Sequence, residues 1–330
     1  MIIEQLLHYQ NNIPQLDIVE HYQQNIIPVL NINNPVFSLD NPAISKQLYQ
    51  LFFEGTGALI IRGAYSQPQM EQYNKWCEDT LELVKMDGNI RHPKQKDKYL
   101  INNVIDRMST SNPDLLVSLL TNPYLTYCMD SLLGFGKIGS CTTHWIEPGG
   151  DRQSSHVDYP IHIGSGDFWE NSVEKAQNLI TDYQLNHILP YYSIQILIAS
   201  DKMNQQNGST ELIPCSHRLE NIDYKILDTT ISNSLEPYFI NVDLQQGDFL
   251  IFNRRLCHRG GKNISSNRRN SLIIQSIWLW GIGQEIINSS IIIDRLVKTS
   301  NKYQQLADTE KKKFQLRIDF PYPKDVSKST

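Results

Sequence analysis

Apolar residues recur three and four positions apart through much of residues 43–135, which is the period of a helix. The pattern is clearest in AISKQLYQLFFEG (43–55) and in PDLLVSLLTNPYLTYCMDSLLG (113–134), and the second run ends at a glycine that suits a helix C-cap. Between them, GALIIRGAY (57–65) is typical of a short buried strand. We therefore expect residues 1–135 to form a mostly helical N-terminal part.

After Gly136 the pattern changes to short apolar runs separated by turn residues. Runs bounded by Gly, Pro, Asn or Asp at this spacing indicate an antiparallel sandwich or barrel. The expected strands are KIGSCTTHWIEPGG, YYSIQILIASD, STELIPCSH, GDFLIFNRRLCH and NSLIIQSIWLWG. We expect a single domain, 1–330, with a β core over about 136–282 and an extension over about 283–330. A polar insertion over 164–189 interrupts the strands, where binding loops tend to lie.

Composition narrows the class of partner. Of 330 residues, 40% are hydrophobic and 20% are charged, and the net charge is -5, which is typical of a globular protein without the basic field that nucleic acid requires. The start of the chain has no basic, apolar leader, so we expect neither export nor a membrane partner. The five cysteines form no C-x-x-C pair and are expected to be small buried hydrophobes in a reducing cytoplasm.

Three residues combine into a candidate metal site. His156 and Asp158 are two positions apart, which taken alone is equally typical of a half-exposed strand. His258 stands just before the Gly260-Gly261 turn, where a lone histidine would more often serve a hydrogen bond. Two imidazoles and one carboxylate together form the facial triad that binds Fe(II) and leaves room for a 2-oxo acid and O2.

An arginine gives the triad a specific cosubstrate. Arg269 follows His258 by eleven residues, at the start of the next expected strand. Its planar guanidinium can hold the distal carboxylate of 2-oxoglutarate through two parallel hydrogen bonds. Strand alternation places its neighbour Arg268 on the opposite, outer face. Gln195 is either a polar residue tolerated in a strand or a second group near the oxo acid, and we predict the latter as a secondary contact.

In order along the chain, these motifs resemble the phytanoyl-CoA dioxygenase family of Fe(II)/2-oxoglutarate oxygenases. The resemblance rests on HVD, NGSTELIPCSHR, GDFLIF and CHRGGKN, followed by Arg269. Cys215 stands where the family usually has the glycine of PGSH, a small-for-small departure away from the metal. The resemblance covers about 136–282 well and the first part only loosely. It implies a mainly β fold with helices, in which a double-stranded β-helix (jelly-roll, cupin-like) core carries the helical part.

The resemblance also implies the site and the chemistry. Fe(II) would be bound by His156, Asp158 and His258, and 2-oxoglutarate by the metal and Arg269. Halogenases that resemble this family have a small residue in place of the acidic ligand, so Asp158 favours hydroxylation. His144, His162 and His217 are expected to serve hydrogen bonds, because the triad is complete without them.

We therefore predict a dioxygenase that hydroxylates an unactivated C–H bond of a small-molecule metabolite, with succinate and CO2 as coproducts. Three alternatives remain open at this point. The first is a related oxygenase acting on a protein side chain, and the second is a binding protein that kept the fold without turnover. The third, a cupin-like enzyme that uses a metal without an oxo acid, would leave Arg269 without a task.

Overall fold

The computed structural model describes residues 19–21, 27–34, 39, 41–86, 97–158, 193–218, 236–277 and 287–319. Its helices are α2 (Pro42–Tyr49), the π-helix η1 (Gln50–Gly55), α3 (Gln67–Met86), α4 (Val104–Ser111), α5 (Pro113–Leu120), α6 (Pro123–Leu133), α9 (Ser289–Thr299), α10 (Asn301–Gln305) and α11 (Asp308–Ile318), with 3-10 turns at Ser216–Arg218 and Glu236–Tyr238. Its strands are β1 (Val19–His21), β2 (Pro28–Asn31), β3 (Ala58–Arg62), β4 (Lys98–Ile101), β5 (Lys137–Ile146), β6 (Ser193–Ala199), β7 (Thr210–Leu212), β8 (Ile240–Asn241), β9 (Phe249–Asn253), β10 (His258–Gly260) and β11 (Arg269–Ile277).

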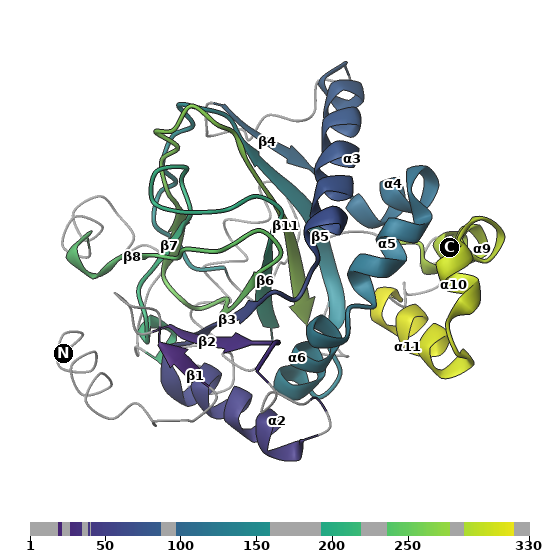
Figure 1. The fold of residues 1–330 in the computed structure, drawn as a ribbon, viewed down its shortest axis with the longest axis horizontal. Helices are drawn as coiled ribbons and strands as arrows, with labels where there is room; N and C mark the ends of the chain where they lie inside the picture. Colours follow the sequence, from purple (N-terminus) through teal and green to yellow (C-terminus); the bar gives the residue numbers. More distant parts are fainter. Residues whose placement is uncertain are drawn as a thin grey trace, which may run out of the picture.

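Two sheets form the core of the molecule (Figure 1). The larger has eight strands in the order β1-β2-β3-β9-β6-β11-β5-β4, and the smaller has three in the order β10-β7-β8. Neighbouring strands are antiparallel except for β2 and β3, which are parallel. These two sheets are the double-stranded β-helix core that the sequence predicted.

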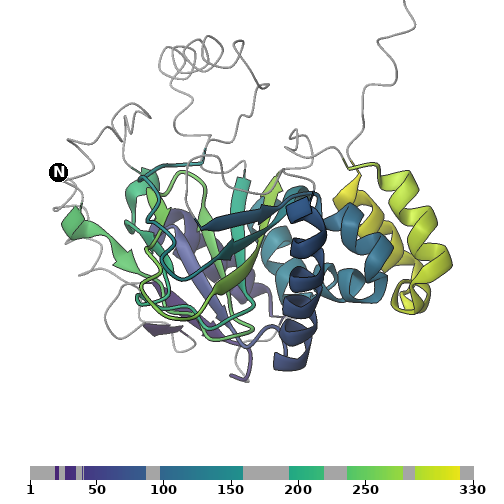
Figure 2. The same cartoon turned by 90° about the horizontal axis from the view of Figure 1, so that it is seen from above.

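Alternation along the strands gives the large sheet two different faces. On β11, Leu272 and Ile274 belong to the larger apolar core, which also contains residues of α3 to α6 and of the C-terminal helices. Ile273 points the other way, into a smaller core shared with Leu212 of the facing sheet. Figure 2 shows these helices gathered on one side of the sheets. The helices therefore cover the outer face and leave the inner face, toward the small sheet, for a site.

The N-terminal part contributes more strands than its pattern indicated. The expected strand within 57–65 is β3, but β2 and β4 also join the large sheet. β4 is only four residues long and follows a run of polar residues, so its sequence shows no clear alternation. The expected helical run over 113–134 is two helices, because Asn122 caps a new helix whose first residue is Pro123.

Three further sequence expectations can be compared with the structure. The five cysteines are all buried and none of them forms a disulfide, as predicted. Cys215 has a φ of 64°, in the left-handed region that favours glycine, which explains why a glycine suits this position. The insertion over 164–189 lies outside the described residues. Among the helices that the structure describes, none combines the length and apolar character needed to cross a membrane.

Candidate metal centre

Backbone pairing brings two distant histidines together. His156 and His258 form an isolated antiparallel bridge, in which each backbone N–H donates to the other residue's carbonyl, at 3.0 and 2.8 Å. Their imidazole rings lie 4.4 Å apart, centroid to centroid. His258 begins β10 after a turn, instead of ending the long strand that the sequence suggested. The pairing holds both rings on the inner side of the small sheet.

Asp158 completes a cluster of three ligand atoms. Its Oδ1 lies 3.9 Å from His156 Nε2, and its Oδ2 lies 3.7 Å from His258 Nε2. Ligand atoms of the three residues all lie within 4.8 Å of one another. Two ligands of one ion, each about 2.1 Å from it, are at most about 4.2 Å apart, so small side-chain adjustments allow all three to reach one metal.

Hydrogen bonds orient both imidazoles for metal binding. His156 Nδ1 lies 2.9 Å from the carbonyl of Ser154, and His258 Nδ1 lies 2.8 Å from the carbonyl of Leu256. A carbonyl accepts only from a protonated nitrogen, so in the neutral rings the Nε2 lone pairs point toward Asp158. Lone pairs aimed at a carboxylate repel it unless a cation lies between them. This arrangement of donors fits a metal ion.

Electrostatics keep His258 neutral. Burial, and then the neighbouring His156, lower the pKa of His258 to about 4. A neutral imidazole is the form that binds a metal. Asp158, whose side chain is 25% exposed, supplies the negative charge that a metal dication needs. The three residues proposed from the sequence therefore lie together, and His258 is held in the neutral form that binds a metal.

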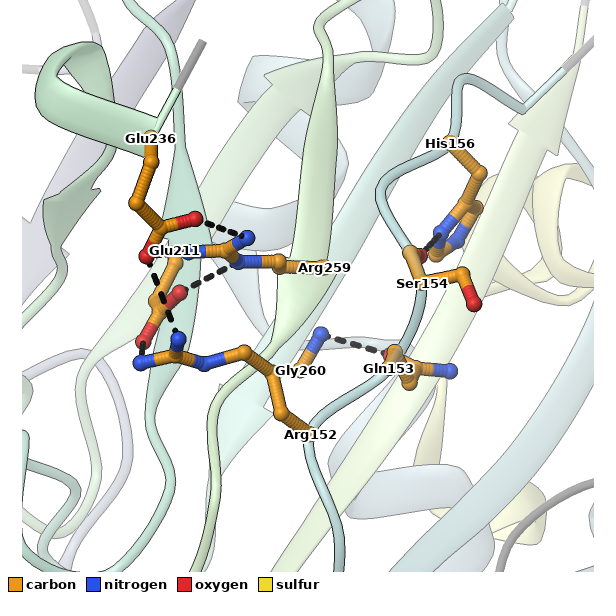
Figure 3. A network of polar contacts seen from close by, with 8 residues as sticks. All are labelled: Arg152, Gln153, Ser154, His156, Glu211, Glu236, Arg259 and Gly260. Carbon is orange, nitrogen blue, oxygen red and sulfur yellow. Dashed lines mark hydrogen bonds and ion pairs between the residues drawn. The ribbon is translucent and has the colours of Figure 1, made fainter. Parts of the chain in front are cut away.

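A network of ion pairs supports the two segments that carry the histidines (Figure 3). Glu211 of β7 accepts from Arg259, the residue after His258, and from Arg152, four residues before His156. Glu236 accepts from the same two arginines. Gln153 accepts from the backbone N–H of Gly260, which adds a direct link between the segments. The network lies beside the cluster and joins four parts of the chain around it.

A cavity of about 250 Å³ lies between the two sheets and contains the metal cluster. Arg269 lines it with a side chain that is almost fully buried. Its Nη2 donates to the carbonyl of Gly208 at 2.8 Å, whereas Nε has no hydrogen-bond partner in the described part of the molecule. Burial lowers the pKa of Arg269 to about 10, so the guanidinium remains charged at neutral pH. A buried cation with an unused donor fits an anionic ligand.

The outward position predicted for Arg268 is confirmed. Its side chain is 42% exposed, forms an ion pair with Glu78 and lies over the ring of Trp145. Arg268 and Arg269 therefore lie on opposite faces of the sheet, as alternation requires.

The cavity also contains a cation that sequence analysis missed. Lys98 of β4 lines it and is 2% exposed. Burial, and then the charge of Arg269, lower the pKa of Lys98 to about 7. Lys98 lies in the short strand that the sequence did not predict. Nothing in the polar sequence around it indicates that this lysine is buried. Lys98 is a second candidate for binding an anion beside Arg269.

The remaining sequence candidates have clear positions. Gln195 lines the cavity, but it pairs with Gln275, six residues along β11 from Arg269, so it is well removed from that residue. His144 also lines the cavity, and the ring of His217 lies 3.1 Å from the carbonyl of Phe53. His162 lies outside the described residues. A role for Gln195 at the oxo acid stays a prediction.

Curated proteins similar to this chain are fungal dioxygenases. Dioxygenase FUM3 of Gibberella moniliformis is 23% identical over 267 residues, which cover 77% of this chain and 78% of the relative. Dioxygenase aneA of Aspergillus aculeatus is 25% identical over 236 residues, or 68% of this chain and 70% of the relative.

Solved structures share the fold at low identity. The epimerase SnoN from nogalamycin biosynthesis, in complex with Fe3+, alpha ketoglutarate and nogalamycin RO, superposes with a TM-score of 0.52 at 14% identity, covering 77% of this chain and 91% of that one. HygX from Streptomyces hygroscopicus, with nickel and 2-oxoglutarate bound, has a TM-score of 0.52 at 13% identity, and the match covers 72% of this chain and 89% of that one. Both resemblances support the jelly-roll core.

The family itself is shown by a match of residues 53–271, well over half of the chain, to the model named phytanoyl-CoA dioxygenase (PhyH). This range includes the three clustered ligands and the cavity residues Lys98 and Arg269. The cofactors of this enzyme class, Fe(II) and 2-oxoglutarate, suit the donors present. The chain belongs to the phytanoyl-CoA dioxygenase family and is an Fe(II)/2-oxoglutarate-dependent dioxygenase.

Proposed function

We propose that this enzyme hydroxylates an unactivated C–H bond of a small-molecule metabolite, with succinate and CO2 as coproducts. His156, Asp158 and His258 hold the Fe(II), and Arg269 holds the distal carboxylate of 2-oxoglutarate. The observation that carries the proposal is a cluster of three ligand atoms within 4.8 Å, inside a cavity that also contains a buried arginine. When bound, Fe(II) and 2-oxoglutarate supply the oxidising chemistry through oxidative decarboxylation with O2.

The residues of the chain perform three tasks in this proposal. The imidazoles of His156 and His258 are fixed by their Nδ1 bonds, so little reorganisation is needed when the metal binds. Arg269, anchored to the carbonyl of Gly208, has a fixed orientation toward an incoming carboxylate. Asp158 occupies a ligand position that a halogenase would leave to an anion, which favours hydroxylation over halogenation.

A small molecule is the favoured substrate class because the inner part of the site is buried. His258 and Arg269 are almost fully buried, and the cavity between the sheets measures about 250 Å³. A protein side chain would have to bring its backbone close to this interior. Enzymes with the same fold include the epimerase SnoN, whose solved complex contains the small molecule nogalamycin RO.

The proposal is tested by measuring succinate release from 2-oxoglutarate by the Fe(II)-loaded protein, first alone and then with metabolite and peptide fractions of a cell extract. The expected result is slow 2-oxoglutarate turnover alone, accelerated by a metabolite fraction that gains one oxygen atom by mass spectrometry. Acceleration by the peptide fraction instead would identify a protein side chain as the substrate. A complete absence of 2-oxoglutarate turnover in every mixture contradicts the proposal.

A further inference from the structure

A second buried arginine lies on the other side of the metal cluster. Arg254 follows strand β9, lines the cavity and has a side chain that is only 4% exposed. Its Nε lies 3.8 Å from Asp158 Oδ2. We propose that Arg254 binds a carboxylate of the substrate, so that the enzyme oxidises an anionic metabolite. This inference rests on the proposed function, because it assigns the substrate class of the same site.

Strand register separates Arg254 from the 2-oxoglutarate end of the cavity. Phe252, two residues before Arg254, pairs with Gln195, and Gln195 pairs with Gln275. Gln275 follows Arg269 by six residues on β11, about 20 Å along an extended strand. The ring of Phe252 lies 4.8 Å from that of His258, so this row of residues borders the metal cluster. A carboxylate at Arg254 is therefore a different group from the one that Arg269 would hold.

The charges of the cavity favour an anion at this position. Of the described side chains that line it, Asp158 is the single acidic one, whereas four are basic: Lys98, Arg254 and Arg269, together with Arg259, whose charge is balanced by carboxylates outside the lining. The charges of a metal dication and of the 2-oxoglutarate dianion cancel. Lys98, Arg254 and Arg269 therefore outweigh Asp158 by two charges when Lys98 is protonated and by one when it is neutral. Excess positive charge in a low-dielectric cavity attracts an anionic ligand strongly.

A fourth basic residue of the cavity, Arg259, differs from Arg254 in its acidic partners. Arg259 also lines the cavity, but its guanidinium bonds to Glu211 and Glu236, and these carboxylates balance its charge. The acidic neighbour of Arg254 in the cavity is Asp158, whose negative charge is shared with the metal once the ion is bound. Metal loading therefore weakens the hold of Asp158 on Arg254, so the guanidinium can also contact a substrate group.

The same end of the cavity has unused hydrogen-bonding capacity. Gln195 lines the cavity, and its Oε1 is buried without a hydrogen-bond partner. Gln275 is 1% exposed and pairs with Gln195 across the strands. Its Nε2 is also buried without a hydrogen-bond partner. Buried polar atoms without partners are uncommon in folded proteins and indicate a ligand or water. The amide of Gln195, which lines the cavity, suits a polar atom of a substrate that Arg254 anchors.

The test uses straight-chain carboxylates from acetate to decanoate, together with the primary amides and primary amines of equal length. Their dissociation constants are measured by calorimetry on the full chain loaded with Ni(II) and 2-oxoglutarate, so binding is read without turnover. Three variants are compared with the wild type: Arg254→Gln, Arg254→Lys and Arg255→Gln. Arg255 is the matched control, because it is the adjacent buried arginine but does not line the cavity.

We expect the tightest carboxylate to bind the wild type at least about tenfold more tightly than its amide. Arg254→Gln should bring this ratio close to one, Arg254→Lys should keep part of it, and Arg255→Gln should leave it unchanged. Binding of Ni(II) and of 2-oxoglutarate is measured first in every variant, and its failure in the wild type would contradict the proposed function instead.

Three outcomes would overturn the inference while leaving the proposed function intact. The first is a wild type that binds no carboxylate at millimolar concentration, or that binds amides or amines as tightly. The second is a carboxylate preference that survives in Arg254→Gln. The third is a loss of Ni(II) affinity in Arg254→Gln with the preference retained, which would make Arg254 a positioning residue for Asp158.

Discussion

Lys98 and Arg269 lie level with each other on either side of strand β5, because the sheet register pairs both of them with Ile146. Both side chains line the cavity, and both are 2% exposed. Two buried cations in one row of a sheet repel each other and require an anion. A distal carboxylate of 2-oxoglutarate between them would meet that requirement.

This relationship predicts how 2-oxoglutarate binding depends on pH. The pKa of Lys98 is lowered to about 7, so above that pH the ligand-free protein holds the amine mostly neutral. An arriving dianion favours the charged amine, so binding should take up a proton, and the affinity should fall by up to about tenfold per unit as pH rises above 7. Calorimetry at pH 7 to 9 in buffers of different ionisation enthalpy measures both effects. Lys98→Met should abolish them.

The pH dependence of the free energy of unfolding of the ligand-free protein provides the control. Between the folded pKa of about 7 and the ordinary value of 10.5, the unfolded chain carries a proton on Lys98 that the folded protein lacks. The free energy of unfolding should therefore rise with pH across this window and lose this contribution as pH falls to 7. Urea unfolding of Lys98→Met should show a smaller rise. An equal pH dependence in the variant would show that Lys98 titrates normally.

Arg269→Ala should raise the apparent Michaelis constant for 2-oxoglutarate steeply while leaving iron binding nearly intact. Removing one partner of a buried, charge-assisted pair costs roughly 2 to 5 kcal/mol, or about thirty-fold to several thousand-fold in affinity. Arg268→Ala is the matched control and should change little, because its side chain is 42% exposed and pairs with Glu78 on the outer face. Steady-state kinetics with varied 2-oxoglutarate measures both. A large effect of Arg268→Ala alone would move the cosubstrate site to the opposite face.

Glu211→Gln tests the support of the metal ligands. This carboxylate bonds Arg259 and Arg152, which flank the segments carrying His258 and His156, so its loss should loosen both imidazoles. We expect the Ni(II) dissociation constant to rise about tenfold, in the range typical of residues that orient metal ligands. Glu236→Gln should have a smaller effect, because that side chain is 49% exposed. If titrations well below the unfolding temperature give unchanged Ni(II) affinity for Glu211→Gln, the network is structural only.

Part of this site was predictable because some of its residues are close together in the sequence. His156 and Asp158 are two residues apart, and strand alternation together with the family resemblance distinguished Arg269 from Arg268. Lys98 escaped prediction because it reaches the cavity only through the pairing of β4 with β5, a long-range contact that no local pattern records. Arg254 and Glu211 escaped for the same reason, since their partners come from distant segments. The spacing of short strands predicted an antiparallel sandwich or barrel, and the resemblance to the family implied the jelly-roll core, whereas β2 joins the sheet through a parallel pairing with β3.

Cys215 offers an independent test of the backbone. Its φ of 64° suits glycine, and the family motif has glycine at this position. Cys215→Gly should therefore change the free energy of unfolding by less than about 1 kcal/mol, because relief of the left-handed penalty offsets the greater entropy of glycine. Cys215→Val should cost about 1 to 3 kcal/mol, because a β-branched residue is poorly tolerated there. Denaturant unfolding of both variants decides the matter, and equal stabilities would contradict the left-handed conformation.

The central claim is that His156, Asp158 and His258 bind one metal ion, and metal content measures it most directly. The purified chain is stripped with chelator, reloaded with Fe(II) under anaerobic conditions and analysed for iron by elemental analysis, alongside His156→Ala, His258→Ala and the outer-face control Arg268→Ala. We predict one iron per chain in the wild type and in Arg268→Ala, and loss of most of it in each histidine variant, because too few ligands remain to hold the ion. Full iron retention by both histidine variants would contradict the assignment of the metal centre.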